Sequence, residues 1–463
     1  MKKLLPLILA AMMVIGLVPL AATAEAPVTI KWVSLGGGMP ENYDTWKTKV
    51  DAYLMEKIGV NLDVEVLSWG AYGDRRNAIV NGGEEFDIIF TDGGSYAADI
   101  EKGALLDVTE LLPTAAPELY KTIPEDMWEA IKINGKFYAV PTIKDSALAQ
   151  FFILDPEVVE KTGIDASTIK DLAGLDPLFK KMKENGVDTP FMLNKGGMYQ
   201  MLDVYDGMGM GNPLIGVRYD DEERKVVSVF EQEEIVNQLK QLNTWVKEGI
   251  INADASTLTE YPTYRPFYMG QGWKGAWNYE GRVFDSYMFL GPIFSSGTVM
   301  GSMNGISAGT KNPEKVLAFL ELVNTDTKLR DMICYGEEGV NFEYKDGLVV
   351  QDDNNPWTWA RYTQGNHLIL TPTTSDPEFI NNLKDVNATA KASVVMGFNV
   401  DRSNMEDELA AMKAIYEKYV SEMMTGVRAP DEIIPQMLNE LKAVGFDDVM
   451  AEAQRQVDEH FKK

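Results

Sequence analysis

The residue types that carry most catalytic and metal chemistry are scarce in this sequence. Among 463 residues there are two histidines, His367 and His460, and one cysteine, Cys334. A Ser-His-Asp or Cys-His catalyst needs a histidine within hydrogen-bond reach of its nucleophile, and zinc, haem and iron–sulfur sites need clusters of the same ligands. The sequence therefore predicts no catalytic residue, no metal site and no cofactor.

Carboxylates, in contrast, are abundant. There are 70 Asp and Glu residues against 43 Lys and Arg, which gives a net charge of −27. Such a chain repels phosphate backbones and anionic lipid, so neither nucleic acid nor a membrane surface is an expected partner. Glycoside hydrolysis needs only two suitably spaced carboxyl groups, so an exported glycosidase stays open as an alternative.

Aromatic side chains in polar surroundings are the more informative feature. These are Trp69, Trp273, Trp277, Trp357 and Trp359, which lie beside glycines and polar residues rather than in apolar periodic runs. Flat aromatic faces in polar loops suit sugar rings, whose C–H faces are apolar while their hydroxyl groups need polar partners. Packing between structural elements is the alternative for each tryptophan.

The first part of the sequence alternates strands and helices. β-branched runs near 28–33, 61–67 and 86–91 predict strands, and the spacing of apolar residues from Trp46 to Leu54 predicts a helix between the first two. Such alternation is typical of a parallel sheet, whose ligands lie beyond the carboxyl ends of the strands.

The rest of the sequence predicts a second α/β unit and a helical end. The apolar run at 151–154 begins the second unit, and a capping box at Ser403 and Glu406 opens the helices. Without internal repeats, two lobes built from interleaved segments are expected. We predict an α/β fold with lobe 1 at residues 25–140 and 290–345, and lobe 2 at residues 141–289 and 346–463, including C-terminal helices at 403–462.

The first residues have the pattern of a secretory signal peptide. Lys2 and Lys3 precede an apolar run at 4–20 and then a series of small residues. We predict a signal peptide at residues 1–24 and a mature start at Glu25. No later window is both apolar and of membrane length, so the mature chain is expected outside the cytoplasmic membrane, periplasmic or extracellular, without direct membrane insertion.

Four segments in order carry a family resemblance: Gly83–Thr91, Leu105–Thr109, Ile133–Pro141 and Lys311–Leu320. They resemble the recurring segments of the family 1 extracellular solute-binding proteins of carbohydrate ABC importers. The resemblance implies a periplasmic-binding-protein-like fold with crossover strands between two lobes. It further implies a monomer that holds an oligosaccharide in the inter-lobe cleft and delivers it to the permease subunits of the importer.

The C-terminal part resembles one branch of that family. The segments at 396–401, 441–446 and 452–458 are similar to the C-terminal domain of a lipoprotein-type branch. Members of that branch usually carry a lipid-modified cysteine at the cleavage point. This chain departs from the pattern, because Cys334 lies far from residue 25.

Loop positions then suggest which residues contact the ligand. On the first lobe, Asp92 is expected to accept hydrogen bonds from hydroxyl groups, with Tyr43 and Trp69 from neighbouring loops. On the second lobe, the expected stacking residues are Trp273, Trp277 and Trp359, and the expected polar partners are Glu280 and Asn366. A binder of peptides, amino acids or cationic solutes is the alternative, because the chain is strongly acidic.

Overall fold

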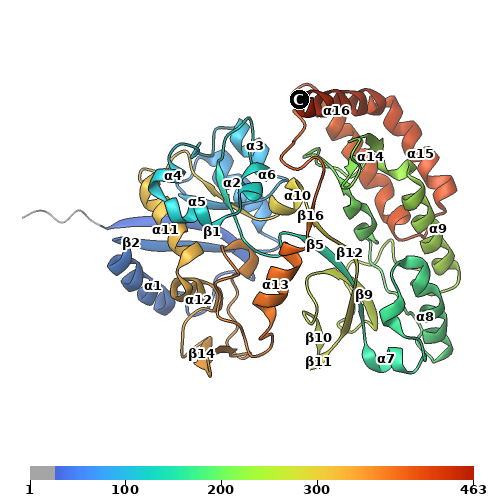
Figure 1. The fold of residues 1–463 in the computed structure, drawn as a ribbon, viewed down its shortest axis with the longest axis horizontal. Helices are drawn as coiled ribbons and strands as arrows, with labels where there is room; N and C mark the ends of the chain where they lie inside the picture. Colours follow the sequence, from blue (N-terminus) through green and yellow to red (C-terminus); the bar gives the residue numbers. More distant parts are fainter. Residues whose placement is uncertain (1–26, 463) are drawn as a thin grey trace, which may run out of the picture.

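The computed structural model describes residues 27–462. It consists of two α/β lobes that lie side by side, with crossing segments between them (Figure 1). The predicted signal peptide, residues 1–24, and the predicted start at Glu25 lie outside the described residues. Within the described part of the chain, no helix combines the length and apolar character needed to cross a membrane.

The first lobe is built on a five-stranded sheet in the order β2-β1-β3-β13-β4. Its strands are β1 (Val28–Gly36), β2 (Val60–Ser68), β3 (Ile88–Thr91), β4 (Ala139–Pro141) and β13 (Met303–Ile306). β1 is parallel to β2 and β3, whereas β13 is antiparallel to both β3 and β4. The strands predicted from the β-branched runs are confirmed, and β13 is the late segment that completes the sheet.

Helices cover both faces of this sheet. They are α1 (Tyr43–Lys57), α2 (Tyr72–Gly82), α3 (Tyr96–Glu101), α4 (Leu112–Ala115), α5 (Pro117–Thr122), α6 (Glu125–Ala130), α11 (Pro313–Thr325) and α12 (Thr327–Tyr335). The core beneath them is rich in aromatic residues, and Trp32 packs edge-on against Phe319 with ring centroids 5.6 Å apart. Pro313 occupies the first turn of α11, where its missing N–H has no partner to lose.

The second lobe is built on a four-stranded sheet in the order β16-β12-β5-β9. Its strands are β5 (Leu148–Leu154), β9 (Phe267–Gln271), β12 (Asp285–Phe294) and β16 (Lys391–Ala392). β5 is antiparallel to β9 and β12. The helices that pack on it are α7 (Pro156–Glu160), α8 (Leu172–Glu184) and α9 (Glu233–Lys247). The predicted apolar run at 151–154 is therefore the end of β5, one of the two inner strands of this sheet.

Smaller elements lie at the periphery. They are β6 (Tyr205–Asp206), β7 (Ile215–Arg218) and β8 (Val226–Ser228) in one sheet, the hairpins β10 (Asn278–Tyr279) with β11 (Arg282–Val283) and β14 (Phe342–Lys345) with β15 (Leu348–Gln351), and the helices α10 (Ser296–Val299) and α13 (Phe379–Ala388).

The C-terminal helices pack onto the second lobe. They are α14 (Glu406–Met424), α15 (Pro430–Ala443) and α16 (Phe446–Phe461), and they share one hydrophobic core with α8 and α9. The helical end predicted for residues 403–462 is thus present. The capping box predicted at Ser403 and Glu406 is wrong, because α14 has no side-chain cap and the Ser403 N–H donates to Asp401 Oδ1.

Segments of the chain cross between the sheets, as the interleaved organisation requires. Residues 142–147 join β4 to β5, and residues 295–302 join β12 back to β13. The exact bounds of the lobes stay a prediction. Trp359, which the sequence assigned to the second lobe, pairs with Gly36 at the end of β1 and lies in the core of the first lobe.

Candidate functional site

The carboxyl edge of the first sheet carries an exposed aromatic surface. Trp69 directly follows β2, and its side chain is 58% exposed. The indole stacks on the ring of Tyr362, with centroids 6.2 Å apart and planes inclined by 16°. Tyr362 in turn meets Phe90 of β3 edge-on at 6.0 Å. The stack therefore has one side fixed by the sheet while the indole remains open to a ligand.

Asp92 lies beside this stack, one residue after β3. Its Oδ1 accepts a hydrogen bond from the Gly94 N–H at 3.0 Å, which fixes the carboxylate at the start of the loop. Burial first, and then the charge of Asp92, raise the pKa of the Tyr362 hydroxyl. The carboxylate is therefore within electrostatic range of the aromatic pair. We call Trp69, Asp92 and Tyr362 the edge cluster.

A fully buried arginine positions the loop that carries Tyr362. Arg330 on α12 donates from Nε to the Asn366 carbonyl at 3.0 Å, from Nη1 to Gln364 Oε1 at 2.6 Å and from Nη2 to the Arg361 carbonyl at 3.3 Å. Burial lowers the pKa of Arg330 from its ordinary value. These bonds curl residues 361–366 around one guanidinium group.

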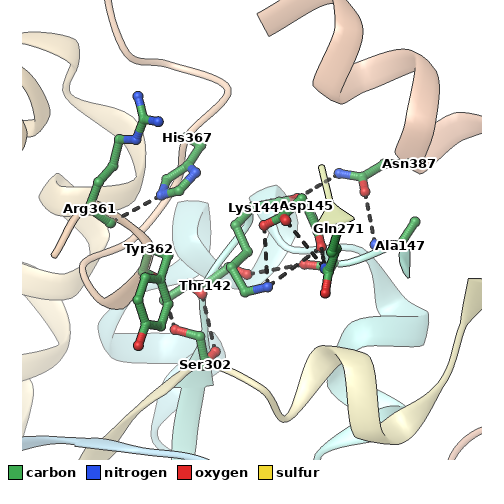
Figure 2. Close-up of polar contacts among 11 residues, drawn as sticks. Thr142, Lys144, Asp145, Ala147, Gln271, Ser302, Arg361, Tyr362, His367 and Asn387 are labelled. Carbon is green, nitrogen blue, oxygen red and sulfur yellow. Dashed lines mark hydrogen bonds and ion pairs between the residues drawn. The ribbon is translucent and has the colours of Figure 1, made fainter. Parts of the chain in front are cut away.

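The same loop is tied to the crossing segments. The Arg361 carbonyl lies 3.0 Å from Nε2 of His367, and the backbone N–H of His367 donates to the Ile143 carbonyl at 2.7 Å. Burial, followed by the positive charges of Arg330 and Arg361, holds the pKa of His367 well below its usual range. The imidazole is therefore neutral at pH 7 and has a structural role. Figure 2 shows the side chains of Arg361 and Tyr362 pointing in opposite directions.

Polar residues also gather where the chain crosses between the lobes (Figure 2). Lys144 Nζ and Asp145 Oδ1 are 3.4 Å apart, and Gln271 at the end of β9 donates from Nε2 to Asp145 Oδ2 at 3.3 Å. We call Lys144, Asp145 and Gln271 the crossover group. The Ser302 hydroxyl donates to the Tyr362 carbonyl at 2.8 Å, and the Thr142 hydroxyl donates to the Ser302 carbonyl at 3.1 Å, which links this group to the edge cluster.

A cavity of about 700 Å³ lies between the lobes. The first lobe contributes α3, the end of α6 and the turn after it, and the second lobe contributes residues 396–402 and His460. Gly93, the neighbour of Asp92, lines this cavity, and its N–H donates to the Met300 carbonyl at 2.9 Å. The backbone directly after Asp92 therefore borders a space between the two lobes.

The structure brings together some of the residues predicted to bind ligand. Trp69 and Asp92 both lie in the edge cluster. Tyr43 begins α1 on the outer side of β2, where its hydroxyl donates to Asp63 Oδ1 at 3.1 Å and accepts from the Val64 N–H at 2.7 Å. In this conformation Tyr43 therefore provides a hydrogen-bond acceptor for a backbone N–H of the edge strand β2.

Two further predicted residues are packed in the interior. Trp359 is 3% exposed, donates from Nε1 to the Ser34 hydroxyl at 2.8 Å and meets Trp32 edge-on at 4.7 Å. Asn366 is 2% exposed and donates from Nδ2 to the Asn324 carbonyl at 3.0 Å. Neither side chain has a free surface for a ligand in this conformation.

The remaining predicted residues surround the second sheet. Trp273 donates from Nε1 to Asp376 Oδ2 at 2.9 Å and packs on Phe379 of α13. Trp277 packs against Phe151 with ring centroids 5.2 Å apart. Glu280 is exposed in the turn between β10 and β11. The role of all these residues in ligand binding stays a prediction.

Sequence reasoning missed Tyr362 and the crossover group. Tyr362 lies three residues after Trp359 in the same polar stretch, and the tryptophan was the more obvious aromatic residue there. Lys144 and Asp145 form a charged pair between two apolar strand runs. That interruption is the signal by which a crossing segment could have been found.

One sequence pattern known from hydrolases occurs at the end of β13. Residues 305–309 match the Gly-x-Ser-x-Gly pattern, but Ser307 lies at the end of β13, where its hydroxyl accepts a hydrogen bond from the Gly309 N–H. Within residues 27–462, no group of three His, Cys, Asp or Glu side chains is placed to hold a metal ion.

Most of the chain matches one known family of proteins. Residues 36–328, well over half of the chain, match the model of the bacterial extracellular solute-binding proteins. The chain belongs to this family. The resemblance to the family 1 extracellular solute-binding proteins is therefore confirmed. Residues 394–462 of this solute-binding protein match a second model, which is described only as a domain of unknown function (DUF3502).

Individual relatives are similar to this protein over nearly the whole chain. A carbohydrate ABC transporter substrate-binding protein of Streptococcus pneumoniae is 29% identical, over 96% of this chain and 92% of its own length. The crystal structure of an N-glycan transport solute-binding protein from S. pneumoniae superposes with a TM-score of 0.85 at 28% identity, over 94% of this chain and 99% of that one. The complex of that protein with Man5GlcNAc gives a TM-score of 0.74.

A more distant solute-binding protein has the same fold. An ABC-transporter-associated solute-binding protein from Bifidobacterium longum infantis superposes with a TM-score of 0.66 at 14% identity, over 95% of this chain and all of that one. The predicted fold class, two α/β lobes with a helical C-terminal end, is confirmed by these structures.

Proposed function

We propose that this solute-binding protein captures an oligosaccharide between its lobes and delivers it to the permease subunits of an ABC importer. The observation that carries the proposal is the exposed Trp69–Tyr362 stack beside the Asp92 carboxylate. Stacked aromatic faces next to a hydrogen-bond acceptor suit a sugar ring. The S. pneumoniae relatives, whose names state carbohydrate or N-glycan transport, support the same substrate class.

The arrangement suggests how binding is coupled to lobe movement. One sugar stacks on Trp69 and donates hydroxyl hydrogen bonds to Asp92 on the first lobe. Another part of the ligand reaches the crossover group, where Gln271 and Asp145 offer a donor and an acceptor at the second lobe. A ligand that contacts both lobes favours the closed state by its higher affinity for that state. The permease subunits then bind the closed form.

The protein acts by binding alone, as a monomer outside the cytoplasmic membrane. Its relatives are transport proteins, and its own histidines are held in structural positions or at the surface. Incubation of purified protein with candidate oligosaccharides, followed by product analysis, tests this: released shorter sugars would establish a glycosidase instead. We also assign residues 357–368 to the first lobe, because Trp357, Trp359 and Leu368 pack in its core.

The test of sugar binding is calorimetry with a panel of mono-, di- and oligosaccharides, amino acids and short peptides. Heat confined to glycans is expected. In the W69A variant, glycan affinity should fall by about tenfold or more, because an aromatic stack contributes ~1 kcal/mol beyond its buried area. M55A, which removes another exposed apolar side chain, 42% accessible on α1, is the control and should bind as the wild type does.

The D92N variant separates sugar binding from cation binding. An amide keeps one acceptor for a sugar hydroxyl but removes the negative charge that a cationic solute needs. We expect D92N to weaken glycan binding without abolishing it. Heat with peptides or amino acids alone, lost completely in D92N, would replace the sugar assignment by a cationic solute.

A further inference from the structure

The crossing segment between β4 and β5 is fixed to the first lobe at its start. The Thr142 N–H donates to the Ser302 carbonyl at 3.1 Å. The Ile143 carbonyl accepts from the backbone N–H of His367 at 2.7 Å. At its other end the segment enters β5, an inner strand of the second sheet. When one lobe rotates against the other, residues 144–147 are therefore the part of this segment that has to change.

Residues 144–147 have the form of an incomplete turn. The chain bends at Lys144, Asp145 and Ala147. In a closed β-turn, the carbonyl of the first residue accepts a hydrogen bond from the N–H of the fourth. Here these two groups are the Lys144 carbonyl and the Ala147 N–H, and they are not bonded to each other. The turn is therefore held open.

The side chain of Asn387 on α13 bridges the two ends of this turn. Its Nδ2 donates to the Lys144 carbonyl at 2.8 Å, and its Oδ1 accepts from the Ala147 N–H at 3.1 Å. Figure 2 shows the amide between these two residues. A side-chain amide carries a donor and an acceptor, so one group satisfies both ends of the turn. While it is in place, the two backbone groups have no need of each other.

Helix α13 lies between the lobes and contacts both (Figure 1). Phe379 and Leu383 pack in one core with Tyr335 of α12. Val386, the neighbour of Asn387, packs against the core of the first lobe and against the residues on one face of the second sheet. Three residues after α13, β16 begins and pairs with β12. A change in the arrangement of the lobes therefore moves the Asn387 amide relative to the turn.

We propose that Asn387 is a positioning residue whose amide leaves the turn when a glycan closes the lobes, after which the Lys144 carbonyl accepts the Ala147 N–H directly. The inference rests on the proposed function and extends it. The indole of Trp69 is 58% exposed, so the conformation described here is one that a ligand can enter. The inserted amide accordingly belongs to the open arrangement. Both arrangements satisfy the two backbone groups, as buried or half-buried N–H and C=O groups require.

The turn also carries one residue of the crossover group. Asp145 is its second residue, and the Asp145 carbonyl accepts from Gln271 Nε2 at 3.2 Å. The second and third residues of a turn are those whose φ and ψ angles set its type. Closure of the turn therefore reorients Asp145. The position that this carboxylate takes against a ligand depends on Asn387, which itself touches no ligand.

NMR on the full mature chain identifies the acceptor of the Ala147 N–H directly. In isotope-labelled protein, scalar coupling across the hydrogen bond connects the Ala147 nitrogen with the carbon of the acceptor group. Without ligand, we expect this carbon to be Cγ of Asn387. With a saturating amount of the tightest-binding glycan of the calorimetry panel, which includes Man5GlcNAc, we expect it to be the carbonyl carbon of Lys144.

The N387A variant provides a second readout, the affinity for the same glycan. In the wild type, closing breaks two hydrogen bonds of Asn387 and forms one within the turn. N387A avoids this net loss of about one hydrogen bond, so it should bind the glycan about fivefold more tightly. Removal of a merely structural contact would not tighten binding. N381A is the matched control, because the Asn381 amide bonds to Glu378 beside the same helix, and it should bind as the wild type does.

Thermal unfolding of each variant checks its folding. If N387A does not fold, the coupling measured in the wild type decides alone. Absence of a coupling to Lys144 in the glycan complex, or an affinity of folded N387A equal to or below that of the wild type, would overturn the role of Asn387 and leave the proposed function intact. A wild type that binds no sugar would overturn both.

Discussion

Asp203 is a half-buried carboxyl group of the second lobe, and its side chain contacts Gln150 near the start of β5. It accepts a hydrogen bond from Gln150 Nε2 at 2.8 Å, and burial raises the pKa of Asp203 to about 7. Gln150 Oε1 is buried and has no hydrogen-bond partner among residues 27–462. In the register of β5 and β9, Gln150 is opposite Gln271 of the crossover group, so both side chains lie on one face of the sheet. A change of charge at Asp203 therefore changes the electrostatic potential close to the crossover group.

The D203N variant should change how stability depends on pH. In the wild type the folded state binds a proton with a pKa of about 7, whereas the unfolded state releases it near the ordinary value of 3.8. Between these values the folded state holds more protons, so the Asp203 contribution to stability is lost as pH rises from about 4 to 7. The neutral amide avoids this loss, and D203N should be more stable than the wild type by ~1–3 kcal/mol at pH 8 and by a clearly smaller margin at pH 5.

Urea unfolding at pH 5 and pH 8 measures this difference. D353N, at an exposed position, is the control and should follow the wild type at both pH values. If D203N and the wild type changed in parallel between pH 5 and pH 8, Asp203 would have an ordinary pKa in the folded protein.

At the scale of elements, the loop at residues 359–367 is the part that gives the edge cluster its second ring. It has no regular secondary structure apart from one short turn at Arg361–Thr363, so its shape depends on side chains. Arg330 satisfies three acceptors of this loop, and Trp359 anchors its start in the core. The loop thus depends on α12 for the position of Tyr362.

Replacing Arg330 should loosen this loop. R330M leaves Gln364 Oε1 and the Asn366 carbonyl buried without the donors that Arg330 supplies, which should lower the free energy of unfolding by about 3 kcal/mol. R330K keeps one charge but not the planar set of donors, so an intermediate loss is expected. Glycan affinity should fall in both variants, because Tyr362 no longer supports Trp69.

Urea unfolding and calorimetry test this prediction together. R455M removes an exposed arginine from α16 and is the control, with an expected change below about 1 kcal/mol. An R330M variant as stable as the wild type would mean that the packing of Trp359, and not the guanidinium, holds the loop.

The strands of the first sheet could be predicted from the sequence, whereas the loop at 356–370 could not. Strands β1, β2 and β3 follow from runs of β-branched residues, because a buried strand needs such a run wherever it lies. The loop at 356–370 has no period, so nothing local indicated that Trp359 would pair with Gly36 across more than 300 residues. Polar neighbours made Trp359 and Asn366 resemble surface residues, although buried hydrogen bonds satisfy them. Trp69 and Asp92 directly follow strands, which is why the sequence placed them at the carboxyl edge of the sheet, where the structure has them.

At the scale of the whole molecule, the lobes approach each other at the cavity. A Cβ built on Gly397 would lie 3.8 Å from the Cβ of Glu129 on the opposite lobe. This separation is within the range that a disulfide spans. The one native cysteine, Cys334, is buried, so introduced cysteines can pair without competition from it.

The double variant E129C/G397C should therefore lock the lobes together on oxidation. Small-angle scattering should record a smaller radius of gyration on glycan binding in the reduced protein and no change in the oxidised protein. Cysteine at position 397 must adopt a φ near +82°, which costs ~1–2 kcal/mol, so G397C alone serves as the folding control. The same compaction in both redox states would mean that the lobes do not move about this contact.

The position of β13 in the first sheet delays the completion of that sheet during synthesis of the chain. β13 lies between β3 and β4, and it is reached only after the whole central part of the second lobe has been traversed. A nascent chain that ends near residue 300 has β3 and β4 but no strand to join them, so each presents an open edge. The first lobe cannot close early during synthesis. For a member of an extracellular family this delay is useful, because a chain that is still open can be threaded through a membrane and can fold on the far side.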